Sequence, residues 1–176
     1  AFASGANAAG AAVEHVGLAS TDQLYYASGA LGLPGAMFTA SHNPAQYNGI
    51  KLCRAGARPV GQDSGLAVVR KHAEELLGDL AAVADGPSRV EHRDVLADYA
   101  AHLRSLVDLS GIRPLKVIVD AGNGMGGHTV PAVLGDQVLP ALPLRIVPLY
   151  FELDGTFPNH EANPLDPANL VDLQEA

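Results

Sequence analysis

Residues 115–134 read LKVIVDAGNGMGGHTVPAVL, which is the pattern of a strand, a glycine-rich turn and a helix. The apolar run Leu115–Val119 has the length of a buried strand. Glycines from Gly122 to Gly127 interrupt it, and the segment 128–134 can then form a helix. A strand that leads through a turn into a helix is the repeating step of α/β proteins, so this stretch predicts an α/β fold.

The same step occurs earlier in the chain. Residues 13–18 (VEHVGL) predict a short strand, and Ser20 is a suitable N-cap for a helix through residues 23–31. Two further strands are predicted over residues 36–39 and 49–54, on either side of a polar loop at 41–48. Ligands of open α/β sheets bind beyond the carboxyl ends of strands, so this loop is a candidate ligand-binding site.

Two apolar stripes with helical spacing follow. The first is expected to belong to a helix that packs on a sheet, capped by Asp63 and Ser64 and ended by Gly78; its members are Leu66, Val69, Ala73, Leu76 and Leu77. Residues 84–92 read as a linker. The second stripe predicts a helix that connects two domains; its members are Val95, Tyr99, Leu103, Leu106 and Val107.

We therefore expect mixed sheets with flanking helices in two domains, at residues 1–90 and 91–176, with a further strand at residues 144–149. The Ala-rich opening, residues 1–15, predicts an interrupted helix without a cap. It has neither the basic leader nor the apolar core of a secretion signal. The expectation from both ends is that the first domain is truncated at its start and the second is incomplete at its end.

Composition limits the classes of partner and location. The chain has 176 residues, 48% of them hydrophobic, which is enough for a sizeable core. A formal charge of −8 argues against nucleic acid as a partner. No apolar stretch is long enough to span a membrane. Cys53 is the single cysteine, so no disulfide can form within the chain, and a reducing compartment, the cytoplasm, is expected.

The polar loop gathers groups that could carry out phosphoryl transfer. Ser41 supplies a hydroxyl nucleophile, His42 an imidazole, Asn43 an amide and Lys51 a cation. Positioning and positive charge near the phosphoryl oxygens are what such a transfer needs most. The plain alternative is that Ser41 only caps a turn while the other side chains are solvated.

A serine hydrolase is a third interpretation of the same loop. Ser41 lacks the flanking glycines of the G-x-S-x-G elbow. Neighbouring side chains on an extended chain point apart, so His42 is expected to be poorly placed to take the Ser41 proton. Both points count against a hydrolase.

Several ordered stretches resemble one family. TASHNP (39–44), followed by NGIK (48–51), is similar to the phosphoserine loop of the alpha-D-phosphohexomutase superfamily, and more closely to its phosphomannomutase/phosphoglucomutase branch. The resemblance extends to three other stretches and so covers nearly the whole chain. They are GLASTDQLYYASG (17–29), VDAGNGMGG (119–127) and ELDGTFPNHEANPLDPANLVDL (152–173).

The resemblance implies roles for the loop. Ser41 would be the phosphorylated residue, and its phosphate would also bind the catalytic Mg²⁺. Lys51 would assist proton transfer and neutralise charge, and His42 would be the active-site histidine. Supporting positions in the same loop are Thr39, Asn43 and Asn48. The family's three Asp ligands lie in a D-G-D-x-D-R loop that this sequence lacks, so no carboxylate is assigned to the metal.

The implied reaction is phosphotransfer between the 1- and 6-positions of a hexose phosphate, through a bisphosphorylated sugar. Glucose and mannose phosphates are the expected substrates, because Thr39 and Ala40 resemble that branch, with hexosamine phosphate still open. The sugar-reading and phosphate-clamping loops of the family have no counterpart here, so this chain alone is expected to have little activity. A catalytically silent sugar-phosphate-binding or scaffold domain of the same fold is the alternative.

Two further features have competing interpretations. The glycine run Gly122–Gly127 fits neither G-x-G-x-x-G nor a P-loop, so a structural turn with close helix–sheet packing is favoured over a ligand site. Asp154, His160 and Glu161 could suggest a metal cluster. Prolines around them favour a stiff connecting loop instead.

Overall fold

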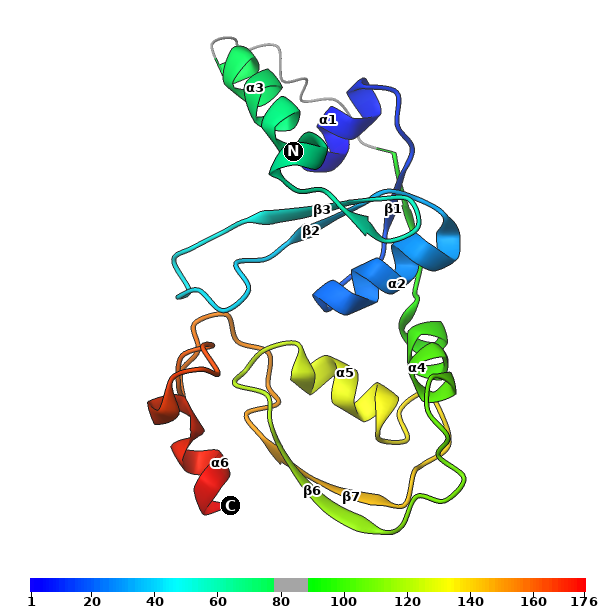
Figure 1. The fold of residues 1–176 in the computed structure, drawn as a ribbon, viewed down its shortest axis with the longest axis vertical. Coiled ribbons are helices and arrows are strands. Elements are labelled where there is room, and N and C mark those ends of the chain that lie inside the picture. Colours follow the sequence, from blue (N-terminus) through cyan, green and yellow to red (C-terminus); the bar gives the residue numbers. More distant parts are fainter. Residues whose placement is uncertain (78–88) are drawn as a thin grey trace.

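The computed structural model describes residues 1–77 and 89–176 as two α/β units joined by a helix (Figure 1). The elements before the undescribed residues are α1 (Phe2–Ala8), β1 (Val13–His15), α2 (Thr21–Leu31), β2 (Gly35–Phe38), β3 (Ile50–Arg54), β4 (Arg58–Pro59), the helical turn η1 (Gln62–Leu66) and α3 (Ala67–Leu76). Those after them are β5 (Val90–His92), α4 (Leu96–Ser105), β6 (Leu115–Asp120), α5 (Gly126–Val133), β7 (Leu144–Leu149), the 3₁₀ turn η3 (Pro167–Leu170) and α6 (Val171–Glu175). The predicted α/β class is confirmed.

The first unit contains both kinds of strand pairing. Strands β2, β3 and β4 form an antiparallel sheet, in which Met37 lies opposite Lys51. Strand β1 pairs in parallel with β5, so that Val13 lies opposite Val90. The interpretation of residues 84–92 as a linker is therefore wrong for residues 90–92, since they form a strand of the first unit. This strand crosses the predicted domain boundary after residue 90, and the boundary stays a prediction.

Helix α2 begins and ends where its sequence predicts. The Ser20 hydroxyl accepts a hydrogen bond from the Gln23 backbone N–H at 3.3 Å, and Gly32 ends the helix with a φ of 66°. The buried Ser28 hydroxyl lies 2.7 Å from the Leu33 carbonyl oxygen and 3.1 Å from that of Arg54. These contacts join α2 to the sheet that carries the polar loop.

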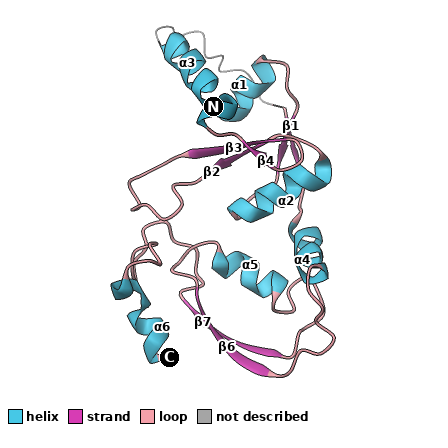
Figure 2. Ribbon diagram, in the orientation of Figure 1, coloured by secondary structure: helices cyan, strands magenta, loops and turns pink. Residues whose placement is uncertain are grey.

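Helix α4 connects the two units, as predicted. Leu96, Tyr99 and Ala100 are buried with Ala132 of α5, which places a small core between these helices. The Tyr99 hydroxyl donates a hydrogen bond to the Asp22 carboxylate, so α4 is also bonded to α2. The connecting helix thus packs on both sides of the junction (Figure 2).

The second unit is the strand–turn–helix–strand step predicted from residues 115–149. Strands β6 and β7 pair in parallel, from Leu115 opposite Leu144 to Asp120 opposite Leu149, and α5 lies between them in the chain. A Cβ added to Gly127 would lie 1.9 Å from the backbone oxygen of Phe151. This close approach favours the structural interpretation of the glycine run.

Three sequence-based expectations differ from the structure. Strand β1 ends at His15 rather than residue 18, since Gly17 turns the chain with a φ of 76°. Ser64 accepts a bond from the Gly61 N–H in the turn η1, before α3 begins at Ala67. No residue of α3 is buried, and its Val69 is 47% exposed, so the packing of this stripe on a sheet is wrong. The predicted stop at Gly78 lies outside the described residues.

Helix α1 covers only the first part of the Ala-rich opening. Helix α1 ends at Ala8, after which Gly10 adopts a φ of 86° and the chain leads into β1. The interrupted helix expected over residues 1–15 is therefore limited to residues 2–8. Within the described ranges, no helix is long and apolar enough to cross a bilayer.

Candidate active site

The polar loop connects β2 to β3 and is closed at its base by the backbone. The Thr39 N–H donates to the Gly49 carbonyl oxygen at 3.0 Å. A Cβ on Gly49 would lie 2.8 Å from the Thr39 oxygen, so the strands can approach this closely only with glycine there. Asn48 accepts a bond from the Gly49 N–H through its side chain at 2.8 Å. The hairpin therefore holds the loop at the end of a sheet.

Ser41 lies in a tight turn and is exposed. Its φ is 58°, in the left-handed region that residues other than glycine seldom adopt. The Ser41 N–H donates to the Thr39 hydroxyl at 2.9 Å, and the Asn43 amide donates to the Ala40 carbonyl at 3.0 Å. Thr39 and Asn43 thus shape the turn on both sides of Ser41, while their supporting role in catalysis stays a prediction.

His42 lies closer to the Ser41 hydroxyl than the sequence suggested. The Ser41 Oγ and His42 Nδ1 are 3.4 Å apart, at the long limit of a hydrogen bond. The expectation that His42 is poorly placed to take the Ser41 proton stays a prediction, although the two side chains do not point apart as supposed. It assumed an extended chain, whereas the positive φ of Ser41 turns the two side chains to the same side.

Lys51 lies on the adjacent strand. It is exposed on β3, directly across the antiparallel pair from Met37. Within residues 1–77 and 89–176, no hydrogen bond or ion pair joins it to Ser41. Its role in charge neutralisation stays a prediction.

The loop faces residues of the second unit across one cavity of about 1460 Å³. Most of its lining comes from α1, β1, α2, β2 and α3 of the first unit, and Ser41 and His42 are part of that lining. The second unit supplies the carboxyl end of β6 together with the segment that follows β7. Figure 1 shows the cyan loop between β2 and β3 directly above the orange chain that leads to α6. The arrangement is a cleft between two α/β units, with an exposed hydroxyl on one wall.

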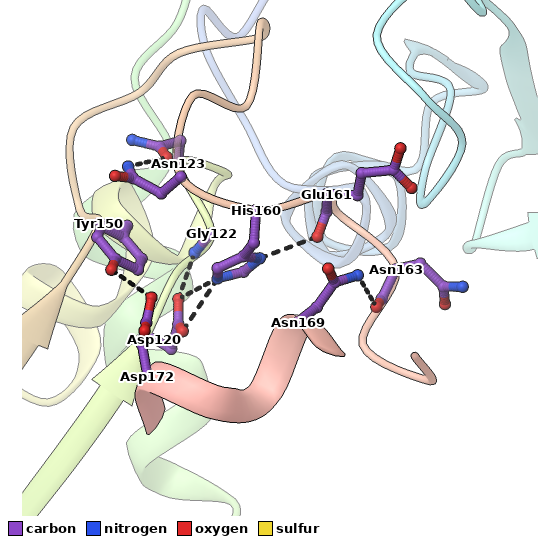
Figure 3. A network of polar contacts seen from close by, with 10 residues as sticks. Asp120, Gly122, Asn123, Tyr150, His160, Glu161, Asn163, Asn169 and Asp172 are labelled. Carbon is purple, nitrogen blue, oxygen red and sulfur yellow. Dashed lines mark hydrogen bonds and ion pairs between the residues drawn. The ribbon is translucent and has the colours of Figure 1, made fainter. Parts of the chain in front are cut away.

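The opposite wall is built around His160 (Figure 3). Its Nε2 lies 3.0 Å and 3.1 Å from the two carboxylate oxygens of Asp120, and its Nδ1 lies 2.9 Å from the Glu161 carbonyl oxygen. The His160 side chain is 16% exposed and that of Asp120 is 6% exposed. The bond to the Glu161 carbonyl raises the pKa of His160 first of all; burial opposes this, and Asp120 adds to it.

Asn123 fixes the backbone of the same wall. It is 5% exposed and also has a left-handed φ, of 58°. Its N–H donates to the Tyr150 carbonyl at 2.8 Å, and its side-chain amide donates to that of Glu152 at 2.9 Å. The Asn159 amide donates to the Asn123 side-chain oxygen at 2.8 Å. Hydrogen bonds of Asn123 therefore connect the glycine turn to the segment after β7.

The metal interpretation of Asp154, His160 and Glu161 finds no geometric support. Asp154 accepts bonds from the Thr156 N–H and hydroxyl, which lower the pKa of its carboxyl, and His160 is bonded to Asp120 instead. No group of three or more His, Cys, Asp and Glu side chains in the described part of the chain could hold a metal ion. The described residues therefore do not by themselves form a carboxylate site for Mg²⁺.

Sequence reasoning missed the Asp120–His160 pair and the Asn123 hub. The partners Asp120 and His160 are 40 residues apart in the chain. The available signal was that Asp120 ends an apolar strand directly before the glycine turn, since polar groups at such ends face the ligand edge of a sheet. Nothing in the spacing of residues 154–164 indicated that His160 returns to that edge.

Both halves of the chain match one family of proteins. Residues 1–77 match the description "Phosphoglucomutase/phosphomannomutase, alpha/beta/alpha domain I", and residues 97–176 match domain II of the same family. The chain is 42% identical to the phosphohexose mutases of Xanthomonas campestris pv. campestris (strain ATCC 33913), over 96% of its length and 36% of theirs. It is 38% identical to the phosphomannomutase of Salmonella montevideo, over 100% of its length and 39% of that protein.

Solved structures give the same result. A phosphoglucomutase/phosphomannomutase family protein from Burkholderia thailandensis superposes with a TM-score of 0.71 at 32% identity, over 94% of this chain and 35% of that one. A protein from Thermus thermophilus described as a phosphomannomutase superposes with a TM-score of 0.69 at 28% identity, over 90% of this chain and 35% of that one. The chain thus spans between a third and two fifths of the length of these relatives.

Proposed function

Because this chain belongs to the phosphoglucomutase/phosphomannomutase family, we propose that the protein containing it moves a phosphoryl group between the 1- and 6-positions of a hexose phosphate. The relatives named above include phosphohexose mutases and a phosphomannomutase, which supports mannose and glucose phosphates as substrates. Hexosamine phosphate is the less favoured substrate within the same chemistry.

The observation that carries the proposal is the position of Ser41. Its hydroxyl is exposed in a tight turn, lines the cleft between the two units, and has His42 within 3.4 Å. A side chain that carries a phosphoryl group needs this access, because the sugar must approach the phosphorus from outside. A serine that only caps a turn would need neither the cleft nor a neighbouring imidazole.

The proposed reaction has two transfers. In the first, a sugar hydroxyl attacks the phosphorus on Ser41; the bond from phosphorus to the serine oxygen breaks, and the sugar becomes a bisphosphate. In the second, the serine oxygen attacks the other phosphate of the reoriented sugar, which restores the phosphoserine and releases the isomer. The attacking hydroxyl loses its proton in each transfer, and the leaving oxygen is released as an alcohol.

The chain's own residues would assist in different ways. Lys51, as a cation, would neutralise charge that develops on the phosphoryl oxygens and would donate a proton to the leaving oxygen. The neutral amine that results would accept the proton of the attacking hydroxyl. His42 would hydrogen-bond to the Ser41 oxygen, which is the leaving group in the first transfer and the attacking atom in the second. Thr39, Asn43 and Asn48 would hold the turn, so that Ser41 keeps one orientation during both transfers.

The Mg²⁺ dependence, the low activity of this chain by itself and the cytoplasmic location stay predictions. Mg²⁺ dependence belongs to the complete protein, since the described residues do not build a metal site around Ser41. Low activity of the 176-residue chain by itself follows from the expectation that the sugar is bound by segments beyond it. A cytoplasmic location is predicted from the single cysteine.

Phosphate occupancy of Ser41 tests the assignment. We expect the complete protein, purified without phosphatase treatment, to carry one phosphoryl group that peptide mass spectrometry locates at Ser41. The Ser41→Ala variant should lose it and lose mutase activity. Ser110→Ala is the matched control, because Ser110 is exposed and lies outside the cleft. A phosphate-free Ser41 in active protein would overturn the proposal.

A further inference from the structure

The His160 ring is enclosed by acceptors at both of its nitrogens. The Glu161 carbonyl oxygen faces Nδ1 at 2.9 Å and can only accept, so Nδ1 must carry a proton. The Asp120 carboxylate faces Nε2 at 3.0 Å, and in its ionised form it can also only accept. Both contacts are satisfied together only when both ring nitrogens are protonated, which makes the side chain a cation.

The surroundings favour this cation. Asp120 comes from the end of β6, and Asp172 of α6 adds a second negative charge that acts on the ring. The Tyr150 ring meets the His160 ring edge to face at 5.5 Å between centroids, and its hydroxyl donates to Asp172 at 2.5 Å. Glu161 contributes its backbone oxygen. These are the charged and titratable groups that face the ring in the described residues.

The ring also closes a packing contact that depends on glycine. A Cβ on Gly122 would lie 3.0 Å from His160 Cε1, and Gly122 has a φ of 50°. The Gly122 N–H donates to an oxygen of Asp120 at 2.8 Å, which orients that carboxylate toward the ring. His160 therefore connects the segment after β7 to the glycine turn, where the missing Cβ of Gly122 leaves room for the ring.

We propose that His160 is a positioning residue, held as an imidazolium between Asp120 and the Glu161 carbonyl, which fixes the cleft wall of residues 157–164 across from Ser41. Phe157, His160, Glu161 and Pro164 line the same cavity as Ser41, so the bond determines where this wall stands. The role of this wall in catalysis rests on the proposed function. The contact between His160 and Asp120 does not depend on that proposal.

Loss of a proton would release this wall. A neutral ring would keep Nδ1–H on Glu161 and turn the lone pair of Nε2 toward the Asp120 carboxylate, which is repulsive. Because the folded pKa of His160 is raised above its ordinary 6.5, the stabilisation is fully present below about pH 6.5. It is lost as the pH rises through the higher folded value.

The experiment needs only the 176-residue chain, with no sugar or phosphate. Nitrogen-15 NMR of His160, assigned with a His160→Gln variant, is expected to show both ring nitrogens protonated at about pH 6.5 and a midpoint above that of an ordinary histidine. Amide exchange in residues 157–163, corrected for intrinsic rate, should rise about fivefold or more between about pH 6 and 9.

Asp120→Asn is the decisive variant. Its amide can donate to a neutral Nε2, so the wall should stay bonded while the pH dependence of exchange disappears and the midpoint of His160 falls. Asp172→Asn is the matched control: it removes a charge that is not hydrogen-bonded to the ring, and should lower the midpoint less. A single protonated ring nitrogen at about pH 6.5, or exchange that is insensitive to pH in the unmodified chain, would overturn the inference. Neither result depends on the phosphorylation of Ser41, which is measured separately.

Discussion

Ser41 and Asn123 have an unusual backbone conformation that hydrogen bonds from neighbouring residues hold in place. Ser41 and Asn123 both adopt left-handed conformations at turns next to the cleft, one in each unit. Such conformations cost of order 1 kcal/mol or more and persist where surrounding contacts impose them. At Ser41 those contacts are made by Thr39 and Asn43; at Asn123 they are made by the backbone after β7.

At this scale the residue types were predictable and their contacts were not. The sequence identified Ser41 and its loop because a nucleophile, an imidazole and an amide stand together. It did not predict how near His42 lies to the Ser41 hydroxyl. Ser41 has a positive φ, but it is neither glycine nor asparagine, the residues that usually indicate one. It missed His160 because the pairing with Asp120 depends on a long chain return, which no local pattern specifies.

Replacement of Gly127 by alanine tests the packing of the glycine turn. Its Cβ would meet the Phe151 backbone oxygen at 1.9 Å, so the helix or the segment after β7 must move. We expect the free energy of unfolding to fall by about 1–3 kcal/mol, measured by urea denaturation. Gly155→Ala is the control, since nothing lies within 4 Å of its added Cβ and stability should change little. Equal effects of both substitutions would contradict this account of the turn.

At the scale of elements, strands and caps agreed with sequence expectations more often than helix packing did. Strands β6 and β7 and the helix α2 were predicted from apolar runs and from the Ser20 cap, because these signals are local. Strand β5 was missed, because three residues next to a polar stretch carry too little pattern. The exposed apolar stripe of α3 shows that an amphipathic pattern indicates a helix but does not indicate what that helix packs against.

Arg104 joins two elements and allows a direct test. From α4 it donates to the carbonyl oxygens of Val133 at 2.7 Å, Gly135 at 2.8 Å and Pro140 at 2.6 Å, which include groups at the end of α5. Arg104→Met should lower the free energy of unfolding by about 1.5–3 kcal/mol, because charged hydrogen bonds are lost while the apolar stem is kept.

The control for this prediction is an arginine that makes a single, surface ion pair within the described residues. Arg70 pairs with Glu74 on α3, with 77% and 58% of the two side chains exposed. Arg70→Met should cost less than about 0.5 kcal/mol in the same urea titration. If Arg104→Met were as mild as Arg70→Met, the contacts of Arg104 with α5 would not stabilise the junction of the two units.

At the scale of the whole chain, α/β class, two α/β units and family membership were all predictable, because they rest on repeated steps and on several ordered motifs. The cleft was not. It forms where the loop after β2 meets the end of β6 and the segment after β7, and this depends on how α4 packs against both α2 and α5. Only in that arrangement does the exposed serine face a space that a sugar phosphate could enter.

The most direct measurement follows the phosphoryl group itself. The complete protein would be labelled with radioactive phosphate at Ser41 by incubation with labelled hexose bisphosphate, freed of excess label, and mixed with unlabelled glucose 1-phosphate or mannose 1-phosphate. We expect the label to leave Ser41 within the turnover time and to appear in sugar phosphate. Label that stays on the protein, or that appears only as inorganic phosphate, would contradict a serine that carries phosphate reversibly between sugars.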